Sequence, residues 1–351
     1  MSRHASHAIA AIIVGLLLTT ASAGPAAATS PGVNGRITFM RFDEDGRFQI
    51  WVANPDMSHQ VQVTHGPAED GWFPTWSPDG SRIAFSSSRS DPDPGDGMEI
   101  HDVFTMRPDG SDVRKITDSR GYNGKPSWSP DGRWLVFDAD RGDYPRSQGL
   151  YLIRSDGSGQ LRRLTTLPAG SFWQELGRFS PDGSRIAYDE GRGGHVLRNH
   201  QDGRLVAEQD AIFTVRLDGT DVRQLTPWGA HCGDADWSPD GAKLVFACQP
   251  VHAGNIGDVN MVDADGNHLV DLTHDHGLTG FGNDNAFWYE ESFNGTWSPD
   301  GTRIIFVHAS FTAEDGFRMG LQTMKPDGSA RTWISDGEEH QPEWGTAPLL
   351  R

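Results

Sequence analysis

The sequence predicts an all-β protein: a six-bladed β-propeller of four-stranded blades, with the ring closed by pairing of the N- and C-terminal strands. Three recurring signals carry this prediction. They are a turn motif, an apolar triplet that follows each turn, and a Leu-Thr-like strand end, and all three recur in the same phase. Repeats of several short strands, recurring at roughly 40 to 50 residues, are typical of propellers.

The turn motif is Trp-Ser-Pro-Asp-Gly. Its Pro fixes φ at the second position of a type I turn, and its Gly accepts the positive φ that follows. Copies stand at 76–80, 128–132, 179–183 (with Phe for Trp), 237–241 and 297–301. Trp344 opens a further copy that stops short. Each copy therefore marks the end of one strand and the start of the next.

An aliphatic triplet ending in an aromatic residue follows each turn and begins at Ile83, Leu135, Ile186, Leu244 and Ile304. The same triplet stands at 37–39 without a turn before it. Further on, an Asp-Gly turn, a strong hairpin signal, precedes the strand end in five units, and Pro55-Asp56 stands in for it in the first. The strand ends carry Thr64, Thr117, Thr165, Thr226, Thr273 and Ser335. One unit is therefore four strands, A to D.

The two ends of the repeat array complement each other. The first unit lacks strand A, and residues 341–344 supply only a strand A. Pairing of 341–344 beside 37–39 would complete one blade and remove the exposed sheet edges that an open array leaves. We therefore expect a closed ring.

The residues ahead of the repeats predict export. Arg3 precedes an apolar run at 8–20 and an Ala-Ser-Ala site at 21–23, as in a cleavable signal peptide. The run is shorter than the roughly 20 residues that a membrane span needs. We expect a secreted or periplasmic protein without a membrane span, divided into a signal peptide at 1–23, a flexible linker at 24–35, the propeller at 36–345 and a C-terminal tail at 346–351.

The net charge limits the classes of binding partner, and the cysteine content predicts how the chain is cross-linked. The formal net charge of −18 disfavours nucleic acid, whose phosphates would be repelled. The two cysteines predict one disulfide. Strands A and B of the fifth unit fold about the turn at 239–242, which sets Cys232 opposite Cys248, and export permits oxidation.

The recurring Trp-Ser-Pro-Asp-Gly, Ile-Ala-Phe, Asp-Gly-Ser and Leu-Thr elements, between residues 36 and 344, resemble the TolB-type β-propeller repeat. TolB also carries a separate α/β domain ahead of its propeller, and nothing comparable precedes residue 36 here. The resemblance implies a six-bladed propeller with a protein or peptide partner. The same repeat precedes the hydrolase domain of prolyl-oligopeptidase-like peptidases, but this sequence has no Gly-x-Ser-x-Gly nucleophile elbow.

Loop lengths separate two faces. The A–B and C–D turns are short and nearly identical, and we call their side the turn face. The B–C and D–A loops vary, with long insertions at 189–211 and 274–294, and we call their side the variable face. Variable loops on a rigid scaffold commonly carry binding. We expect function on the variable face.

The candidate site residues follow from this face. His231 and Asp234 precede an innermost strand and should look into the tunnel mouth, and His340 reaches the equivalent place from the closing blade. His274 and His276 form a His-x-His pair that suits a metal, although solvated loop histidines are the ordinary alternative. The candidate binding residues are Trp72, Trp173, His231, Asp234, His274, His276, Asp284, Trp288, Glu339 and His340. The candidate metal ligands are His231, His274 and His276.

Three functions remain open on this evidence, and one of them is a purely structural cell-envelope scaffold, which differs from a binding scaffold only in having no selective ligand. We expect a binding scaffold for a protein or peptide, monomeric because no edge strand is left exposed, rather than an enzyme. The alternative is a metal-assisted lyase or hydrolase acting on a saccharide at the tunnel mouth, since some propeller lyases of oligogalacturonides carry related repeats and a histidine-bound metal. That alternative would require a divalent metal, the one cofactor that the sequence suggests, and three or four ligands converging near the axis.

Overall fold

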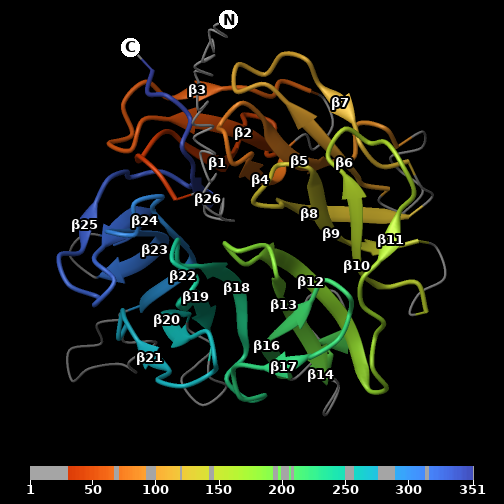
Figure 1. Ribbon diagram of the computed structural model, residues 1–351. Coiled ribbons are helices and arrows are strands. Elements are labelled where there is room, and N and C mark those ends of the chain that lie inside the picture. Colours follow the sequence, from red (N-terminus) through yellow and green to blue (C-terminus); the bar gives the residue numbers. More distant parts are fainter. Residues whose placement is uncertain are drawn as a thin grey trace, which may run out of the picture.

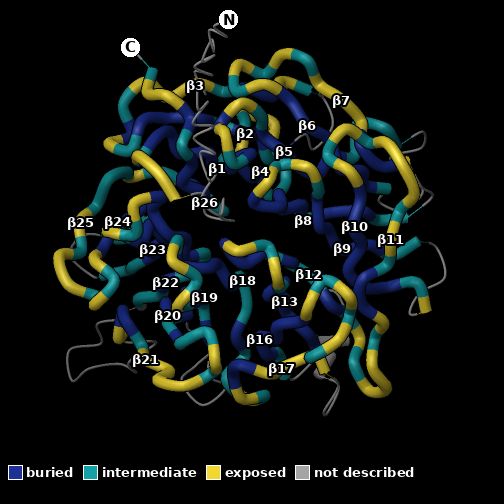
Figure 2. Tube along the Cα trace, in the orientation of Figure 1, coloured by how far each residue is buried: buried dark blue, intermediate teal, exposed yellow. Residues whose placement is uncertain are grey.

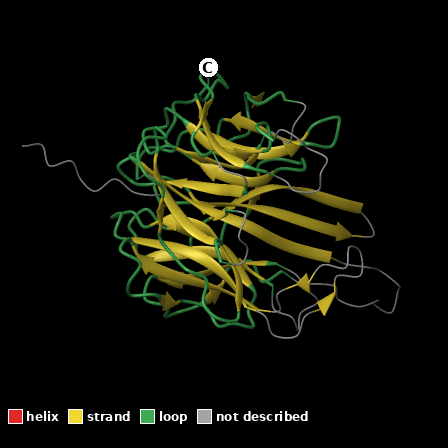
Figure 3. Ribbon diagram, turned by 90° about the vertical axis from the view of Figure 1, so that its right-hand side faces the viewer, coloured by secondary structure: helices red, strands yellow, loops and turns green. Residues whose placement is uncertain are grey.

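The computed structural model describes residues 31–66, 71–91, 100–118, 121–141, 146–192, 197–198, 205–206, 209–249, 257–275, 289–312 and 316–350. Within these ranges the regular elements are strands, and six four-stranded antiparallel sheets stand around a central axis (Figure 1). The same part of the chain contains no helix in the side view (Figure 3). The predicted six-bladed propeller is confirmed. The expected signal peptide lies outside the described residues.

Each blade runs from an innermost strand A to an outermost strand D. Blades 1 and 2 are β26 (His340–Trp344), β1 (Ile37–Phe42), β2 (Phe48–Ala53), β3 (Val61–Gln62); and β4 (Trp72–Trp76), β5 (Ile83–Ser87), β6 (Asp102–Met106), β7 (Arg114–Lys115). Blades 3 and 4 are β8 (Tyr122–Trp128), β9 (Trp134–Asp140), β10 (Gly149–Arg154), β11 (Arg162–Arg163); and β12 (Ser171–Phe179), β13 (Arg185–Arg192), β16 (Gln209–Arg216), β17 (Arg223–Gln224). Blades 5 and 6 are β18 (Cys232–Trp237), β19 (Lys243–Cys248), β20 (Asp258–Asp263), β21 (Val270–Asp271); and β22 (Tyr289–Trp297), β23 (Ile304–Thr312), β24 (Gly316–Met324), β25 (Thr332–Trp333). A separate hairpin between β13 and β16 consists of β14 (Leu197–Arg198) and β15 (Leu205–Val206).

The two ends of the chain close the ring as predicted. β26 pairs antiparallel with β1, and Trp344 lies opposite Ile37 (Figure 1). The chain after β26 continues over the turn face, where Ala347 is fully buried in the cluster that contains Val52 and Trp76. The closing segment is therefore packed into the core between blades 1 and 2.

The turn motif and the Thr or Ser at the strand ends are both explained by local hydrogen bonds. In the turn motif the Ser77 hydroxyl donates to Asp79 (2.7 Å), and Gly80 takes a φ of 65°. At the strand ends the Thr64 hydroxyl accepts a hydrogen bond from the backbone N–H of Ile50 in strand C (2.9 Å). Equivalent hydroxyls do this in every blade. A Thr or Ser is thus selected because it satisfies a buried backbone donor.

The core lies between neighbouring blades. The aromatic residue that closes each innermost strand is at most 7% exposed: Trp76, Trp128, Phe179, Trp237, Trp297 and Trp344. The indole of Trp128 also donates to the Thr75 carbonyl of the preceding blade (3.2 Å). Buried residues concentrate on the inner strands and exposed ones on the outer strands and turns (Figure 2). Aromatic packing between sheets therefore holds the ring together.

The predicted disulfide is confirmed. Cys232 and Cys248 pair directly across β18 and β19 and are bonded. No helix in the described part of the chain is long and apolar enough to cross a membrane.

Candidate functional site

A ring of bulges surrounds the axis on the variable-face side. Each innermost strand shifts its pairing register three residues before its closing aromatic residue, and a non-glycine residue there has a left-handed backbone. These residues, with φ between 47° and 60°, form the bulge ring: Phe73, Lys125, Leu176, Asp234, Asn294 and Gln341. Such a conformation costs of order 1–3 kcal/mol per residue and is concentrated at functional sites.

Below the bulge ring, an ion pair closes the channel. Arg178 of blade 4 reaches Glu343 of blade 1, on the opposite side of the ring, with Nη1 2.8 Å from Oε2. Glu343 also accepts hydrogen bonds from the Thr75 hydroxyl (2.7 Å) and the backbone N–H of the next residue (3.0 Å). We call Arg178 and Glu343 the channel plug. Burial raises the pKa of Glu343, and the guanidinium opposes that rise.

On the variable-face side of the plug lies a cavity of about 460 Å³ between blades 4, 5 and 6. We call it the acidic cavity. Its lining residues with ionisable side chains are Glu175, Asp189, Asp210, His231, Asp234 and Glu291, and its aromatic walls are Trp173 and Phe293. Because the plug lies behind it, the cavity faces the variable loops.

The acids of this cavity are held in an environment that disfavours their charge. Burial, with the neighbouring Asp234 carboxylate, raises the pKa of Asp189 well above its usual range. Burial also raises the pKa of Asp210 to about 6, although the imidazole of His231, with Nδ1 3.6 Å from Oδ2, opposes the shift. These carboxyls gain protons more easily than exposed aspartates do.

Lys125 is the basic residue of the bulge ring. Its ammonium pairs with the carboxylate of Glu175 and lies 5.1 Å from the ring centre of Phe73. Burial lowers the pKa of Lys125, but Glu175 and Asp138 more than offset this and raise it overall. The lysine is therefore charged, and its charge is engaged by Glu175.

The other side of the mouth is aromatic. The rings of Phe42 and Phe48 are stacked with centres 4.0 Å apart, and His340 contacts both edge-on. Trp72 packs edge-on against Phe48 at 5.3 Å. We call Phe42, Phe48, Trp72 and His340 the aromatic rim. Burial lowers the pKa of His340, so its ring is neutral at neutral pH.

The structure places some of the predicted residues together and others elsewhere. His231, Asp234 and Trp173 line the acidic cavity. Trp72 and His340 lie in the aromatic rim. Half of the predicted binding residues therefore lie at the channel mouth. They come from three of the six blades and from the closing strand.

The remaining predicted residues are not at the mouth. Glu339 is fully buried, where it pairs with Arg41 and accepts from the Ser335 hydroxyl (2.8 Å), so it anchors the chain just before β26. His274 follows the outer strand β21, and its largely exposed ring lies 3.1 Å from Asp271. His276, Asp284 and Trp288 lie outside the described residues.

Neither a metal site nor a catalytic triad is formed by the described residues. Over the described ranges no group of three or more His, Cys, Asp or Glu side chains is arranged to hold a metal ion. Ser292, His308 and Asp275 are in mutual contact, but the serine and the aspartate both approach Nδ1 of the ring, at 2.9 and 3.6 Å. A catalytic triad needs them on opposite ring nitrogens. This cluster is therefore a buried polar network.

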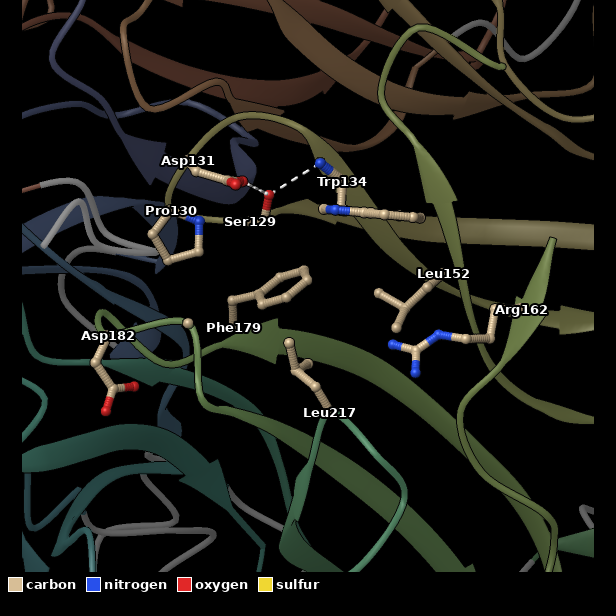
Figure 4. Close-up of a pocket in the computed structure, with 10 residues that line it drawn as sticks. Ser129, Pro130, Asp131, Trp134, Leu152, Arg162, Phe179, Asp182 and Leu217 are labelled. Carbon is tan, nitrogen blue, oxygen red and sulfur yellow. Dashed lines mark hydrogen bonds between the residues drawn. The ribbon is translucent and has the colours of Figure 1, made fainter. Parts of the chain in front are cut away.

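A second cavity, of about 340 Å³, opens on the turn face between blades 3 and 4. Leu152, Phe179 and Leu217 converge on it (Figure 4). Its polar edge is already used by the turn, because the Ser129 hydroxyl donates to Asp131 (2.6 Å) and accepts from the N–H of Trp134 (2.9 Å). The guanidinium of Arg162 also points toward this otherwise largely apolar cavity (Figure 4).

Sequence reasoning missed most of the charged residues in the channel. Lys125 and Asp234 stand three residues before a closing Trp, and Arg178 and Glu343 stand one residue before a closing aromatic residue. Asp189 directly follows the triplet that ends in Tyr188. Asp234 was among the predicted residues, and alignment of the repeats at these three positions would have found the others.

Residues 34–205 match the family described as the TolB beta propeller domain. The chain is 37% identical over 150 residues to the uncharacterized protein Atu1656 of Agrobacterium fabrum, covering 41% of this chain and 47% of that protein. It is 34% identical over 105 residues to the Tol-Pal system protein TolB of Alcanivorax borkumensis, covering 30% of this chain and 22% of that protein. The matches thus span less than half the length of these curated relatives.

The fold is shared with a solved TolB. The crystal structure of TolB from Acinetobacter baumannii superposes with a TM-score of 0.61 at 21% identity, over 89% of this chain and 66% of that chain. This likeness concerns the fold. The repeats and the match at residues 34–205 support a TolB-like β-propeller family for this chain.

Proposed function

We propose that this protein is an exported, monomeric binding scaffold that docks a protein or peptide partner at the channel mouth on its variable face. The observation that carries this proposal is the distribution of exposed phenylalanines. Among the described residues Phe42, Phe172 and Phe317 are 40–59% exposed, and each lies at the variable-face end of its strand. Aromatic residues are enriched in protein interfaces.

The channel plug supports docking rather than threading. Because Arg178 and Glu343 meet across the axis, a segment entering from the variable face meets a paired charge behind the bulge ring. A loop or peptide end that inserts into the mouth would contact the aromatic rim on one side and the acidic cavity on the other.

The curated relatives support a protein as the class of partner. One curated relative is a component of the Tol-Pal system, which makes a protein partner the simplest extension to this chain. The leader-like residues at 1–23 support export.

The test uses a matched pair of exposed apolar residues. Phe42 (41% exposed) belongs to the aromatic rim, and Val222 (54% exposed) lies beside a C–D turn on the turn face. The mature protein and its Phe42→Ser and Val222→Ser variants would each be immobilised and exposed to envelope proteins of the source cell. We expect Phe42→Ser to lose a specific partner that Val222→Ser retains. Equal capture by both variants would contradict docking at the mouth.

A further inference from the structure

The acidic cavity contains buried carboxylate oxygens that the described residues leave unused. Asp189 is 2% exposed, and its Oδ2 accepts a hydrogen bond from the backbone N–H of Asp234 (2.8 Å). Its Oδ1 has no hydrogen-bond partner among the described residues, and the same holds for Oδ1 of Asp210. Both residues line the cavity. A buried acceptor left without a partner costs about 1–3 kcal/mol, and more when it is charged.

The fold does not require a charge at position 189. In blades 1 and 2 a neutral group bonds the backbone N–H of the next blade's bulge-ring residue, whereas in blade 3 the carboxylate of Asp138 bonds that of Leu176. Oγ of Ser86 accepts from the N–H of Lys125 (2.8 Å), and Sδ of Met40 lies 3.0 Å from the N–H of Phe73. A serine or methionine can therefore support the bulge. The carboxylate of Asp189 supplies a second, unused oxygen in addition.

The cavity has an excess of negative charge. Five carboxylates line it, on Glu175, Asp189, Asp210, Asp234 and Glu291. The basic groups nearby are committed, because Lys125 pairs with Glu175 and Arg178 pairs with Glu343. Among the described residues, Nδ1 of His231 lies 3.6 Å from Oδ2 of Asp210. A cationic ligand would complete this arrangement.

The walls suit a cation that carries an apolar stem. Trp173 lies against Gly191 so closely that a Cβ on Gly191 would stand 2.1 Å from the indole, so the glycine leaves room for the ring. Phe293 provides another aromatic wall. Aromatic rings contact both alkyl chains and cations favourably. A volume of about 460 Å³ also falls in the range of about 300–1,000 Å³ that is common for small-ligand sites.

We propose that the acidic cavity binds a basic side chain, lysine or arginine, whose charged end pairs with the incompletely bonded carboxylates of Asp189 and Asp210 and whose stem lies along Trp173. The proposal rests on the proposed function, since the side chain would belong to the segment that the mouth docks. It adds the chemistry by which the partner is recognised. The rim would provide apolar contact, and the cavity would select a positive charge.

Proton release should accompany binding. The charged and titratable groups that face the two aspartates are Glu175 on β12, His231 beside β18, Asp234 on β18, Glu291 on β22 and Lys125 on β8. Because the raised pKa values of Asp189 and Asp210 favour their protonated forms, a cation must displace protons. Affinity should therefore rise as the pH is raised through about 6, the pKa of Asp210.

The experiment is calorimetric titration of the mature protein at pH 7 with Nα-acetyl-lysine N-methylamide and with the arginine analogue. The neutral control ligand is Nα-acetyl-norleucine N-methylamide. Asp189→Asn keeps an acceptor for the Asp234 N–H and removes the charge, and Asp210→Asn is a second variant of the same kind. Asp156→Asn, at an exposed turn of blade 3, is the matched control. We expect each cavity variant to bind the basic probes about tenfold more weakly or worse, and the control to bind normally.

Three outcomes would overturn the proposal: neither basic probe binds, the norleucine analogue binds equally well, or both cavity variants bind as the wild type does. Binding of Ca²⁺ alone that depends on Asp189, with no effect of the basic probes, would also overturn it. The probes need no protein partner, so this result is separate from the capture test. If the basic probes do not bind but Phe42→Ser still loses its partner, only the proposal of a basic-side-chain site is contradicted. If the probes bind but Phe42→Ser captures the same partner as Val222→Ser does, docking at the aromatic rim is contradicted while the basic-side-chain site stands.

Discussion

The channel plug and the acidic cavity place charge in the same channel, one above the other, yet they differ in how that charge is satisfied. In the plug, Glu343 has a guanidinium, a hydroxyl and a backbone N–H as partners. In the cavity, Asp189 and Asp210 each keep one oxygen without a partner among the described residues. Charges that stabilise the fold can thus be distinguished from charges that do not. A fully paired charge holds two blades together, whereas an unpaired one weakens the fold and is useful only when a ligand completes it.

The largest expected effect comes from breaking the plug. Arg178→Met leaves Glu343 buried without its counter-ion, and removing one partner of a buried ion pair costs about 3–5 kcal/mol. The free energy of unfolding, measured by urea denaturation, should fall by that amount. A double variant, Arg178→Met with Glu343→Met, should recover much of the loss. A single-variant loss below about 1 kcal/mol would show that the pair is screened by water in the channel.

The disulfide beside the cavity gives the next effect. Cys232 and Cys248 are separated by 16 residues, and closing a loop of that length restricts the unfolded chain by about 3 kcal/mol. The Cys232→Ala, Cys248→Ala double variant should lose close to this amount in urea denaturation. The oxidised wild type and a sample unfolded under reducing conditions provide the comparison. Equal stability of all three would mean that the bridge adds nothing to the fold.

Neutralising the cavity should have a smaller effect of the opposite sign. Asp189→Asn replaces a buried carboxyl that lacks a full set of partners and whose pKa burial raises, so the free energy of unfolding should stay the same or rise by about 1 kcal/mol. Differential scanning calorimetry at pH 7 would detect this as an unchanged or higher Tm. A fall of the size expected for Arg178→Met would place Asp189 with the plug, as a structural charge.

The smallest effect is a pH dependence. The pKa of Asp210 is about 6 in the folded protein, above the ordinary value of 3.8 for an unfolded aspartate. The folded state therefore holds this proton more tightly, and its contribution to stability is present below about pH 4 and is lost as the pH rises through about 6. Unfolding measured between pH 4 and pH 7 should show this decline in the wild type. Asp210→Asn should lack that part of the decline, and identical pH profiles would contradict the assignment.

The architecture could be predicted from the sequence because local contacts determine it. The Ser77–Asp79 turn and the Thr64 hydroxyl bond are short-range, and they recur with the same residues in every blade that carries them. Ring closure followed from the complementary deficits at 37–39 and 341–344. The Cys232–Cys248 pair followed from the symmetry of a single hairpin.

The charges of the channel could not be predicted in the same way, because their partners are brought together only by the ring. Arg178 and Glu343 are 165 residues apart, and each looks like an ordinary polar residue of a strand. The prediction for His274 illustrates the reverse problem. A His-x-His spacing says nothing about distance from the axis, and His274 follows an outermost strand with its ring exposed beside Asp271.

The most direct test of this account is the stabilisation that Nα-acetyl-lysine N-methylamide gives to the wild type and to Asp189→Asn in urea unfolding. A ligand that binds only the folded state raises the free energy of unfolding by RT ln(1 + [L]/Kd). We expect a rise in the wild type that grows with probe concentration and is nearly absent in Asp189→Asn. An equal rise in both proteins, or none in either, would show that the unused oxygens of the acidic cavity do not receive a basic side chain.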